Sequence, residues 1–290
     1  MNVIRLGDGP IIKPHMDARM GDNINGPSLI RAPGWLGRPL GRYYLFFADH
    51  CGRYIRLAYA DDLLGPWQTH EPGVLPMELA GFRGHVASPD VHVDGERREV
   101  RLYFHGMDRP RDDGSGQTTR VALARNALAY APQAAVLGPP YFRVFRWDDH
   151  WYALVMPGVI YRSRDGLSGF EEGPALFGPE MRHSALRRVG PTLQVFYTLV
   201  GDSPERILLA TVDLRGDWSG WRASSPLVVL EPEREYEGAG LPCAPSVRGP
   251  APGPVRQLRD PAIFEEDGRT YLLYSVAGES GIALAEIRDD

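Results

Sequence analysis

Two short motifs place a group that can transfer a proton beside a cation. Arg259-Asp260-Pro261 sets a carboxylate next to a guanidinium, and Arg182-His183 sets an imidazole next to another. Carboxylates and imidazoles are the side chains that most often act as general acids and bases. Arginine binds anions or polar ligands through several N–H donors. These residue types suit acid–base chemistry on a polar ligand.

A structural role is the competing interpretation of both motifs. An aspartate before a proline at a strand start often only accepts hydrogen bonds from its own turn. A lone histidine is likewise more often structural than catalytic. A functional role is favoured for Asp260 and His183 because both lie at the same position of a repeat, which is described below.

Further candidates surround the second copy of that repeat. Asp90, in Ser88-Pro89-Asp90, is a second carboxylate that either serves the same pocket or binds a neighbouring turn. His85, His92 and His105 lie near it, and His105 is a candidate for contacting a ligand. A metal site built from these histidines stays open, although no tight ligand spacing supports one.

Four more polar residues are candidates because of their positions. Asp22 and Asn25 belong to a polar segment that precedes the first copy, and Tyr141 opens the third copy. Glu237 stands apart from the neighbouring glutamates because the chain tightens there into a turn of small residues. A run of glutamates is normally a solvated surface.

A motif of three strands, with a weaker fourth, occurs five times along the chain. The first strands of the copies cover residues 26–30, 88–93, 139–144, 183–186 and 260–264. The second strands cover 42–48, 100–106, 150–156, 193–199 and 270–276. The third strands cover 54–60, 119–124, 158–163, 206–212 and 281–287. Repeats of this kind predict an all-β, five-bladed β-propeller over residues 1–290, with a generic β-sandwich as the alternative.

The propeller explains how the candidate residues would meet. The innermost strand of each blade lines a central channel, so the starts of these strands converge on one mouth. Asp260, His183, Asn25 and Tyr141 are all at such starts. One connection, 225–257, is rich in proline and glutamate and is expected to be a loop over one face.

Composition excludes several classes of function. The chain has 290 residues, a net charge of -5 and no basic block, which argues against a nucleic-acid partner. Its N-terminus has no apolar signal core and no stretch approaches a membrane span. Its two cysteines do not make a disulfide framework. We expect free thiols and a cytoplasmic location, and the sequence gives no indication of oligomeric state.

The chain resembles the five-bladed propeller glycosidases of family 43 and their relatives in families 32, 62, 117 and 130. The resemblance rests on Arg259-Asp260-Pro261, on Ser88-Pro89-Asp90 and on strand-and-turn phrases such as 55–60 with Gly65-Pro66-Trp67. In that superfamily, acids at the inner-strand starts act as base, acid and pKa modulator. The resemblance implies that Asp260 and Asp90 approximately match two of these positions.

The chain departs from the family 43 pattern in two blades. Asn25-Gly26-Pro27 stands where family 43 has its base aspartate, and Tyr141 opens the third blade in place of an acid. One related family, the neoagaro-oligosaccharide hydrolases, is thought to use a histidine as proton donor. Asp260 and His183 resemble such a pair, which favours a divergent glycosidase.

The resemblance therefore implies an exo-acting glycoside hydrolase that accepts a terminal sugar of an oligosaccharide. Glycoside cleavage needs one group to protonate the leaving oxygen and another to activate water or attack carbon. We expect Asp260 as base with His183 or Glu237 as acid, and Asp90 as a group that orients a hydroxyl or tunes a pKa. Arg182 and Arg259 would bind hydroxyls or the carboxylate of an acidic sugar.

Two alternatives remain from the sequence. A phosphorylase like those of family 130 would use basic residues to bind phosphate in place of water. A non-catalytic propeller would bind carbohydrate without a working carboxylate pair. No cofactor is expected, and a central Ca²⁺ or other metal stays open.

Overall fold

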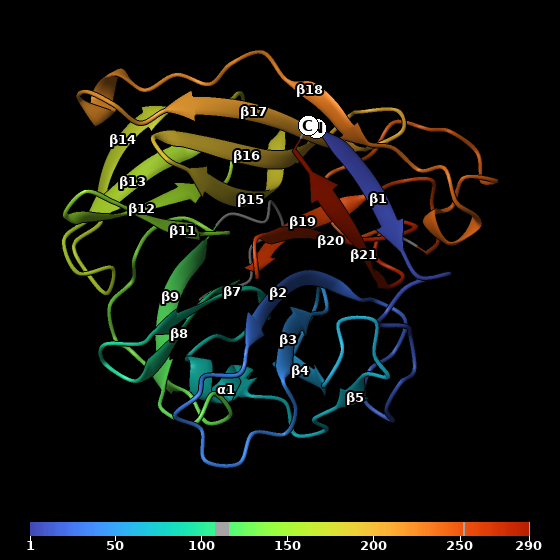
Figure 1. Ribbon diagram of the computed structural model, residues 1–290, viewed down its shortest axis with the longest axis horizontal. Coiled ribbons are helices and arrows are strands. Elements are labelled where there is room, and N and C mark those ends of the chain that lie inside the picture. The colour runs from blue at the N-terminus through green and yellow to red at the C-terminus, as the bar shows by residue number, and fades with distance from the viewer. Residues whose placement is uncertain (108–115, 252, 290) are drawn as a thin grey trace.

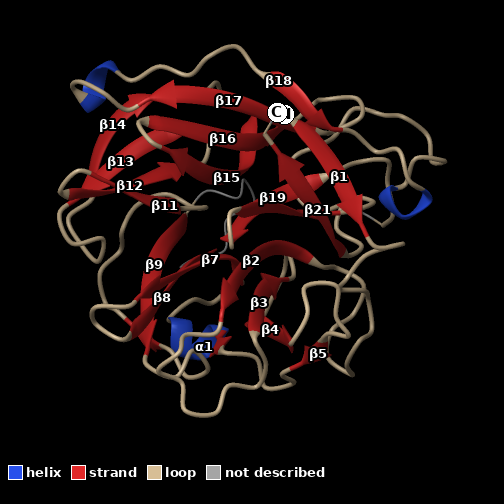
Figure 2. Ribbon diagram, viewed as in Figure 1, coloured by secondary structure: helices blue, strands red, loops and turns tan. Residues whose placement is uncertain are grey.

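Five antiparallel sheets stand around a central axis in the computed structural model, which describes residues 1–107, 116–251 and 253–289 (Figure 1). Helices are short and lie outside the sheets (Figure 2): α1 (Met77–Ala80), η1 (Trp218–Gly220) and η2 (Glu235–Glu237). None of the described helices is long and apolar enough to cross a membrane. The predicted five-bladed β-propeller is confirmed.

Each blade begins with its inner strand and proceeds outward. Blade 1 contains β2 (Asn25–Arg31), β3 (Tyr43–Ala48), β4 (Tyr54–Ala60) and β5 (Gln68–Thr69), and the short β6 (Leu75–Pro76) also pairs with β4. Blade 2 contains β7 (Val86–Asp94), β8 (Glu99–Met107), β9 (Gln117–Ala124) and β10 (Ala131–Pro132). Blade 3 contains β11 (Arg143–Trp147), β12 (His150–Val155), β13 (Val159–Ser163) and β14 (Glu171–Ala175). Blade 4 contains β15 (Met181–Val189), β16 (Thr192–Leu199), β17 (Ile207–Asp213) and β18 (Leu227–Leu230).

Blade 5 joins the two ends of the chain. It contains β19 (Arg259–Glu266), β20 (Arg269–Ser275) and β21 (Ile282–Arg288), and its outermost strand is the N-terminal β1 (Asn2–Leu6), antiparallel to β21. The ring is thus closed by hydrogen bonds between the first and the last strand. This pairing also covers an edge of β21 that would otherwise be open.

The strands are buried on both faces because each sheet packs between two neighbours. In β3, Tyr44 and Phe46 pack with blade 2, whereas Leu45 and Phe47 pack with blade 5. Successive side chains of a strand point to opposite faces. Runs of apolar residues, rather than alternation with polar ones, therefore mark the strands of this fold.

The expected loop at 225–257 is only partly a loop. Its beginning forms β18, the fourth strand of blade 4, and η2 follows shortly after. The apolar stretch Leu227–Leu230 completes the blade, and the rest of the connection leads to blade 5. Both cysteines are free and exposed, as expected.

Candidate active site

A left-handed residue lies within two residues of the start of every inner strand, inside the strand or just before it. These residues, with φ from 45° to 68°, are Gly26, Ser88, Tyr141, His183 and Asp260. In four blades the pairing with the second strand shifts register at this point, which makes a β-bulge. Left-handed backbone is unfavourable for residues other than glycine and persists where the surrounding fold imposes it. Of the positions that the sequence predicted at one mouth, Ser88, Tyr141, His183 and Asp260 line the same pocket.

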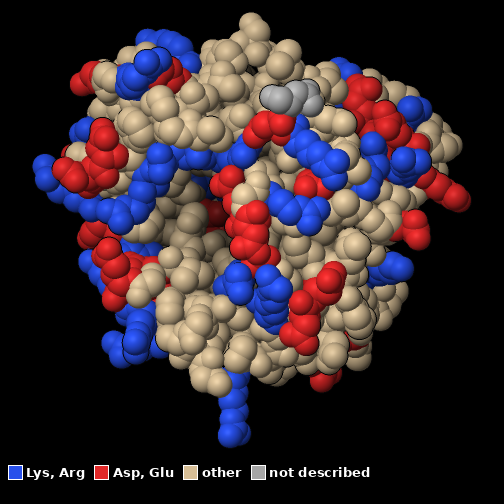
Figure 3. Space-filling model, viewed as in Figure 1, with Lys and Arg blue, Asp and Glu red and all other residues tan. Residues whose placement is uncertain are grey.

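The bulges surround a central pocket of about 630 Å³. Figure 3 shows the molecule hollowed near the centre of one face, where the inner strands surround the channel. Four of the left-handed residues line the pocket: Ser88, Tyr141, His183 and Asp260. A volume of this size suits a small polar ligand.

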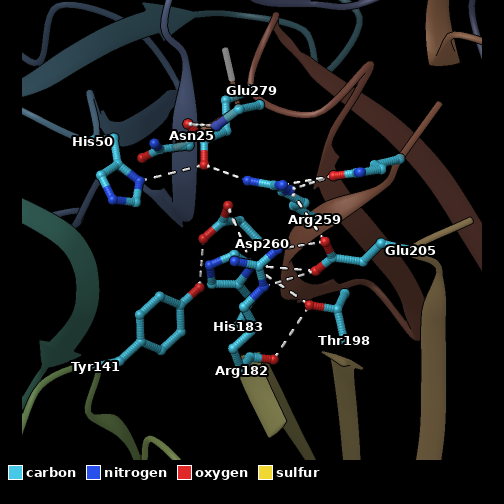
Figure 4. Close-up of polar contacts among 12 residues, drawn as sticks. Asn25, His50, Tyr141, Arg182, His183, Thr198, Glu205, Arg259, Asp260 and Glu279 are labelled. Carbon is cyan, nitrogen blue, oxygen red and sulfur yellow. Dashed lines mark hydrogen bonds and ion pairs between the residues drawn. The ribbon is translucent and has the colours of Figure 1, made fainter. Parts of the chain in front are cut away.

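Asp260 is the carboxylate at the centre of this pocket. It is buried, accepts a hydrogen bond of 2.7 Å from the Tyr141 hydroxyl, and lies 3.8 Å from Nδ1 of His183 (Figure 4). Burial, followed by the negative charge of Glu279, raises the pKa of Asp260 to about 6. The hydrogen bond from Tyr141 and the positive charges of Arg143 and Arg259 act against this rise. Asp260 thus holds a proton at a higher pH than an ordinary aspartate.

Glu279 is a second carboxylate lining the pocket, from the turn between β20 and β21. Its oxygens accept hydrogen bonds from Asn23 at 2.6 Å and Arg259 at 3.0 Å, and His50 lies 3.4 Å away. Burial alone would raise the pKa of Glu279, but the hydrogen bond and charge of His50 and the charge of Arg259 lower it to about 2. The same pocket therefore holds two carboxyl groups whose pKa values are pushed apart.

The buried histidines of the pocket are held neutral. Burial, and then the charges of Arg182 and Arg259, keep the pKa of His183 well below its usual value. Burial, together with His85, does the same for His105. The Tyr141 ring lies between them, with centroid distances of 6.0 Å to His105 and 5.5 Å to His183. Neutral imidazoles both donate and accept hydrogen bonds, as sugar hydroxyls do.

Arg182 lines the pocket and Arg259 directly precedes Asp260, but both are already paired with other residues of the protein. Arg182 donates to Glu205 at 2.9 and 2.5 Å. Arg259 donates to Gln257 and to Glu279, and lies 3.2 Å from Glu205. Their charges are balanced within the protein, so the expectation that they bind a sugar carboxylate is not supported by this geometry.

Arg143 lies beneath the residues that line the pocket, at the end that we call its floor, and borders a second cavity. Its guanidinium donates to the carbonyls of Ser88, Pro89 and Ser184 and so crosses the channel between blades 2 and 4. It also lies 4.2 Å from the centroid of the Tyr141 ring. Beyond Arg143 is a separate cavity of about 160 Å³.

Asp90 lines that second cavity and not the central pocket. Its carboxylate accepts hydrogen bonds from the Val144 amide and from His92, both at 2.8 Å. Asp90 lies two positions after Ser88 along β7, which places its side chain further down the channel. The expectation that Asp90 acts on the same ligand as Asp260 is corrected.

Glu237 is also outside the pocket. It is fully buried and binds Arg5 of β1 at 2.7 and 3.0 Å, the Tyr274 hydroxyl, and two backbone amides of its own turn. Its carboxylate joins the N-terminal strand to the turn that contains it. The expectation of an acid catalyst at Glu237 is corrected to a structural role.

The two candidate residues in the polar segment before blade 1 lie in different places. Asn25 lines the pocket, whereas Asp22 is exposed, pairs with His15 at 2.6 Å and borders a different hollow. The expectation that Asp22 contacts the ligand is therefore corrected. Among residues 1–107, 116–251 and 253–289, no three His, Cys, Asp or Glu side chains are grouped to hold a metal ion.

Sequence reasoning missed His50, Glu205 and Glu279. All three lie in connections between the second and third strand of a blade. Because inner strands start at the pocket, second strands end there, and the connections that follow return to the same mouth. Their place between the second and third strands was a weak signal, because their distance from the second strand differs from blade to blade.

Comparisons with known proteins agree with this architecture. No protein-family model matches the chain. An uncharacterized protein of Acanthamoeba polyphaga mimivirus, R118, is 36% identical over an alignment of 322 residues that covers 98% of this chain and 90% of that protein.

Solved structures with this fold include two groups of carbohydrate-active enzymes. One belongs to the family 130 mannoside phosphorylases, which contain glycoside hydrolases that target β-1,2-mannosidic linkages in Candida mannan. It matches with a TM-score of 0.70 and 12% identity, and the alignment covers 99% of this chain and 94% of that chain. A family 43 β-xylosidase/α-arabinofuranosidase from a compost metagenome, in complex with xylotriose, has a TM-score of 0.65 at 15% identity, with coverage of 98% and 96%. The chain belongs to the same family as the mimivirus protein and has the five-bladed propeller fold of the family 43 and family 130 enzymes, from which it diverges widely in sequence.

Proposed function

We propose that this protein is an exo-acting glycoside hydrolase that cleaves a terminal sugar in the central pocket. The observation that carries the proposal is the pair Asp260 and Glu279, whose pKa values are about 6 and about 2 within one pocket. A pair of carboxyl groups with separated pKa values is what glycoside cleavage requires, one to donate a proton and one to remain ionised.

Asp260 is the proton donor in this proposal. Its raised pKa supports the acid role, which reverses the role of base expected from the sequence. His183 is the less suitable donor, because its pKa is well below the usual range and near neutral pH it lacks the second ring proton that an imidazolium would give up. A neutral His183, 3.8 Å from Asp260, would instead hold a hydroxyl of the sugar.

Glu279 supplies the negative charge opposite the proton donor. It remains ionised because His50, Arg259 and Asn23 stabilise its negative charge. In the proposed reaction it stabilises the positive charge that develops at the anomeric carbon, and it accepts the proton that the attacking water loses as its oxygen bonds to that carbon.

The closed floor supports action on a chain end. Arg143 binds backbone carbonyls of neighbouring blades and separates the pocket from the cavity below it. A pocket with one mouth admits the terminal sugar of an oligosaccharide and leaves the remaining units outside. The substrate would then extend from the mouth into solvent.

Pairing of the arginines favours water over phosphate as the acceptor. Phosphate needs cations that can contact its oxygens, but Arg182 already binds Glu205 in two places. Arg248, another arginine of the pocket lining, contacts the Pro179 carbonyl and Glu180. Neutral sugars fit this charge balance better than acidic ones.

A panel of aryl glycosides and natural oligosaccharides, with and without phosphate, tests the proposal. We expect release of single sugars without phosphate, and loss of that release in Asp260→Asn. Strict dependence on phosphate would make the protein a phosphorylase. Sugar binding by the wild type with no turnover of any bound sugar would contradict catalysis and indicate a carbohydrate-binding propeller.

A further inference from the structure

Glu205 is a buried carboxylate between blades 4 and 5 that the proposed reaction does not use. It lies just before β17 and is fully enclosed. Arg182 of blade 4 binds both of its oxygens, and Nε of Arg259 from blade 5 lies 3.2 Å from Oε2 (Figure 4). One carboxylate thus joins the inner strands of two blades.

The two arginines directly precede the two central residues of the pocket. Arg182 is followed by His183, and Arg259 is followed by Asp260. Both following residues have left-handed backbone, with φ of 50° and 45°. Such conformations are unfavourable for residues other than glycine and persist only where the surroundings hold them. The Arg182–Glu205–Arg259 link ties together the residues that directly precede both.

We infer that Glu205 is a positioning residue of the active site, which holds His183 and Asp260 in register across the boundary between blades 4 and 5. The inference rests on the proposed function for its kinetic consequences. Glu205 lies 4.0 Å from Nδ1 of His183, so it acts on the pocket through the arginines and through charge. It does not line the pocket and is not a catalytic residue.

Charge gives this role a measurable signature. Removing the negative charge of Glu205 leaves Arg182 and Arg259 with an excess of positive charge beside Asp260. The other groups that face Asp260 are Tyr141, His183, Arg143 and Glu279, and none of them is substituted in the variant. Excess positive charge stabilises the ionised carboxyl group, so Asp260 would titrate at lower pH.

The test compares Glu205→Gln with Glu237→Gln. Glu237 is an equally buried glutamate that binds an arginine in two places, but it lies outside the pocket. Both variants should be less stable. Only Glu205→Gln should move the alkaline limb of kcat/KM to lower pH, by about one unit, and lower kcat/KM at the optimum by about tenfold or more. An unchanged pH profile with unchanged kcat/KM would overturn the inference and leave Glu205 a structural residue.

A second variant and a second measurement cover the cases in which the first test gives no result. If Glu205→Gln does not fold, Glu205→Asp retains the charge and shortens the link; kcat/KM should then fall with the pH profile unchanged, and no fall would overturn the inference. If the wild type cleaves no glycoside, the proposed function fails separately. The titration of Asp260 is then followed by carboxyl ¹³C NMR, assigned with Asp260→Asn, and an equal midpoint in wild type and Glu205→Gln would overturn the inference.

Discussion

The phenol of Tyr141 donates a hydrogen bond of 2.7 Å to Oδ1 of Asp260, although the two residues are 119 positions apart. They belong to blades 3 and 5 and face each other across the pocket. Burial and the charge of Asp260 keep the pKa of Tyr141 well above its usual value. The phenol is therefore a permanent donor, and it stabilises the ionised form of the carboxyl group that we assign as the acid.

Replacing Tyr141 by phenylalanine should move the pH profile. The hydrogen bond lowers the pKa of Asp260, so its loss raises that pKa above about 6. The acid then keeps its proton to higher pH, and the alkaline limb of kcat/KM should shift upward by about one unit. Kinetics between pH 4 and pH 9 measure this shift, and a limb that moves downward or stays in place would contradict Asp260 as the proton donor.

Replacing Asp260 by asparagine should remove catalysis. A general acid contributes about 10²- to 10⁴-fold to the rate, so kcat/KM should fall by that factor on a substrate with a poor leaving group. The matched control is Asp213→Asn, because Asp213 is an exposed aspartate on β17 that pairs with Arg215. Equal activity in Asp260→Asn and Asp213→Asn would exclude the proposed role.

The same substitution should stabilise the fold at alkaline pH. A carboxyl group with a pKa of about 6 when folded and about 3.9 when unfolded binds more protons in the folded state. Stability from this group is present at low pH and is lost as pH rises to about 6, with a difference of about 3 kcal/mol. Asp260→Asn avoids this loss, so its gain over wild type should appear at pH 8.

Urea denaturation of both proteins at pH 8 and pH 4 measures this effect. At pH 4 the wild-type carboxyl group is protonated in the folded state, and most of the advantage of asparagine should disappear. A gain of the same size at both pH values would show that the pKa of Asp260 is not raised in the folded protein.

The positions at the pocket were largely predictable because they follow the repeat. Apolar strands of similar length align the five copies, and alignment brings His183 and Asp260 to equivalent places before any contact is known. Glu279 and Glu205 were not predictable in this way, because the connections that carry them differ in length between blades and have no periodic pattern. The sequence could not predict that Asp260 is the acid and not the base, since this role depends on its burial and on the charge of Glu279.

Glu237 was predicted as a functional residue although its role is structural. Its turn of small residues suggested a functional carboxylate, but its partner Arg5 is 232 positions away in the sequence. The N-terminal residues carried no repeat signal by themselves, so neither β1 nor its contact with Glu237 was expected. A buried glutamate needs a cation, and only closure of the ring supplies this one.

Removing residues 1–6 should therefore destabilise the protein strongly. The deletion takes away β1, exposes the edge of β21 and leaves Glu237 as a buried charge without Arg5. Loss of one partner from a buried ion pair costs about 3–5 kcal/mol, and the open edge invites pairing with another molecule. Thermal denaturation should show a lower Tm and light scattering should show association. Arg5→Gln separates the two effects, because it removes the ion pair and keeps the strand. This variant should have a lower Tm and should not associate. A deletion variant as stable as the wild type would show that β1 does not close the ring.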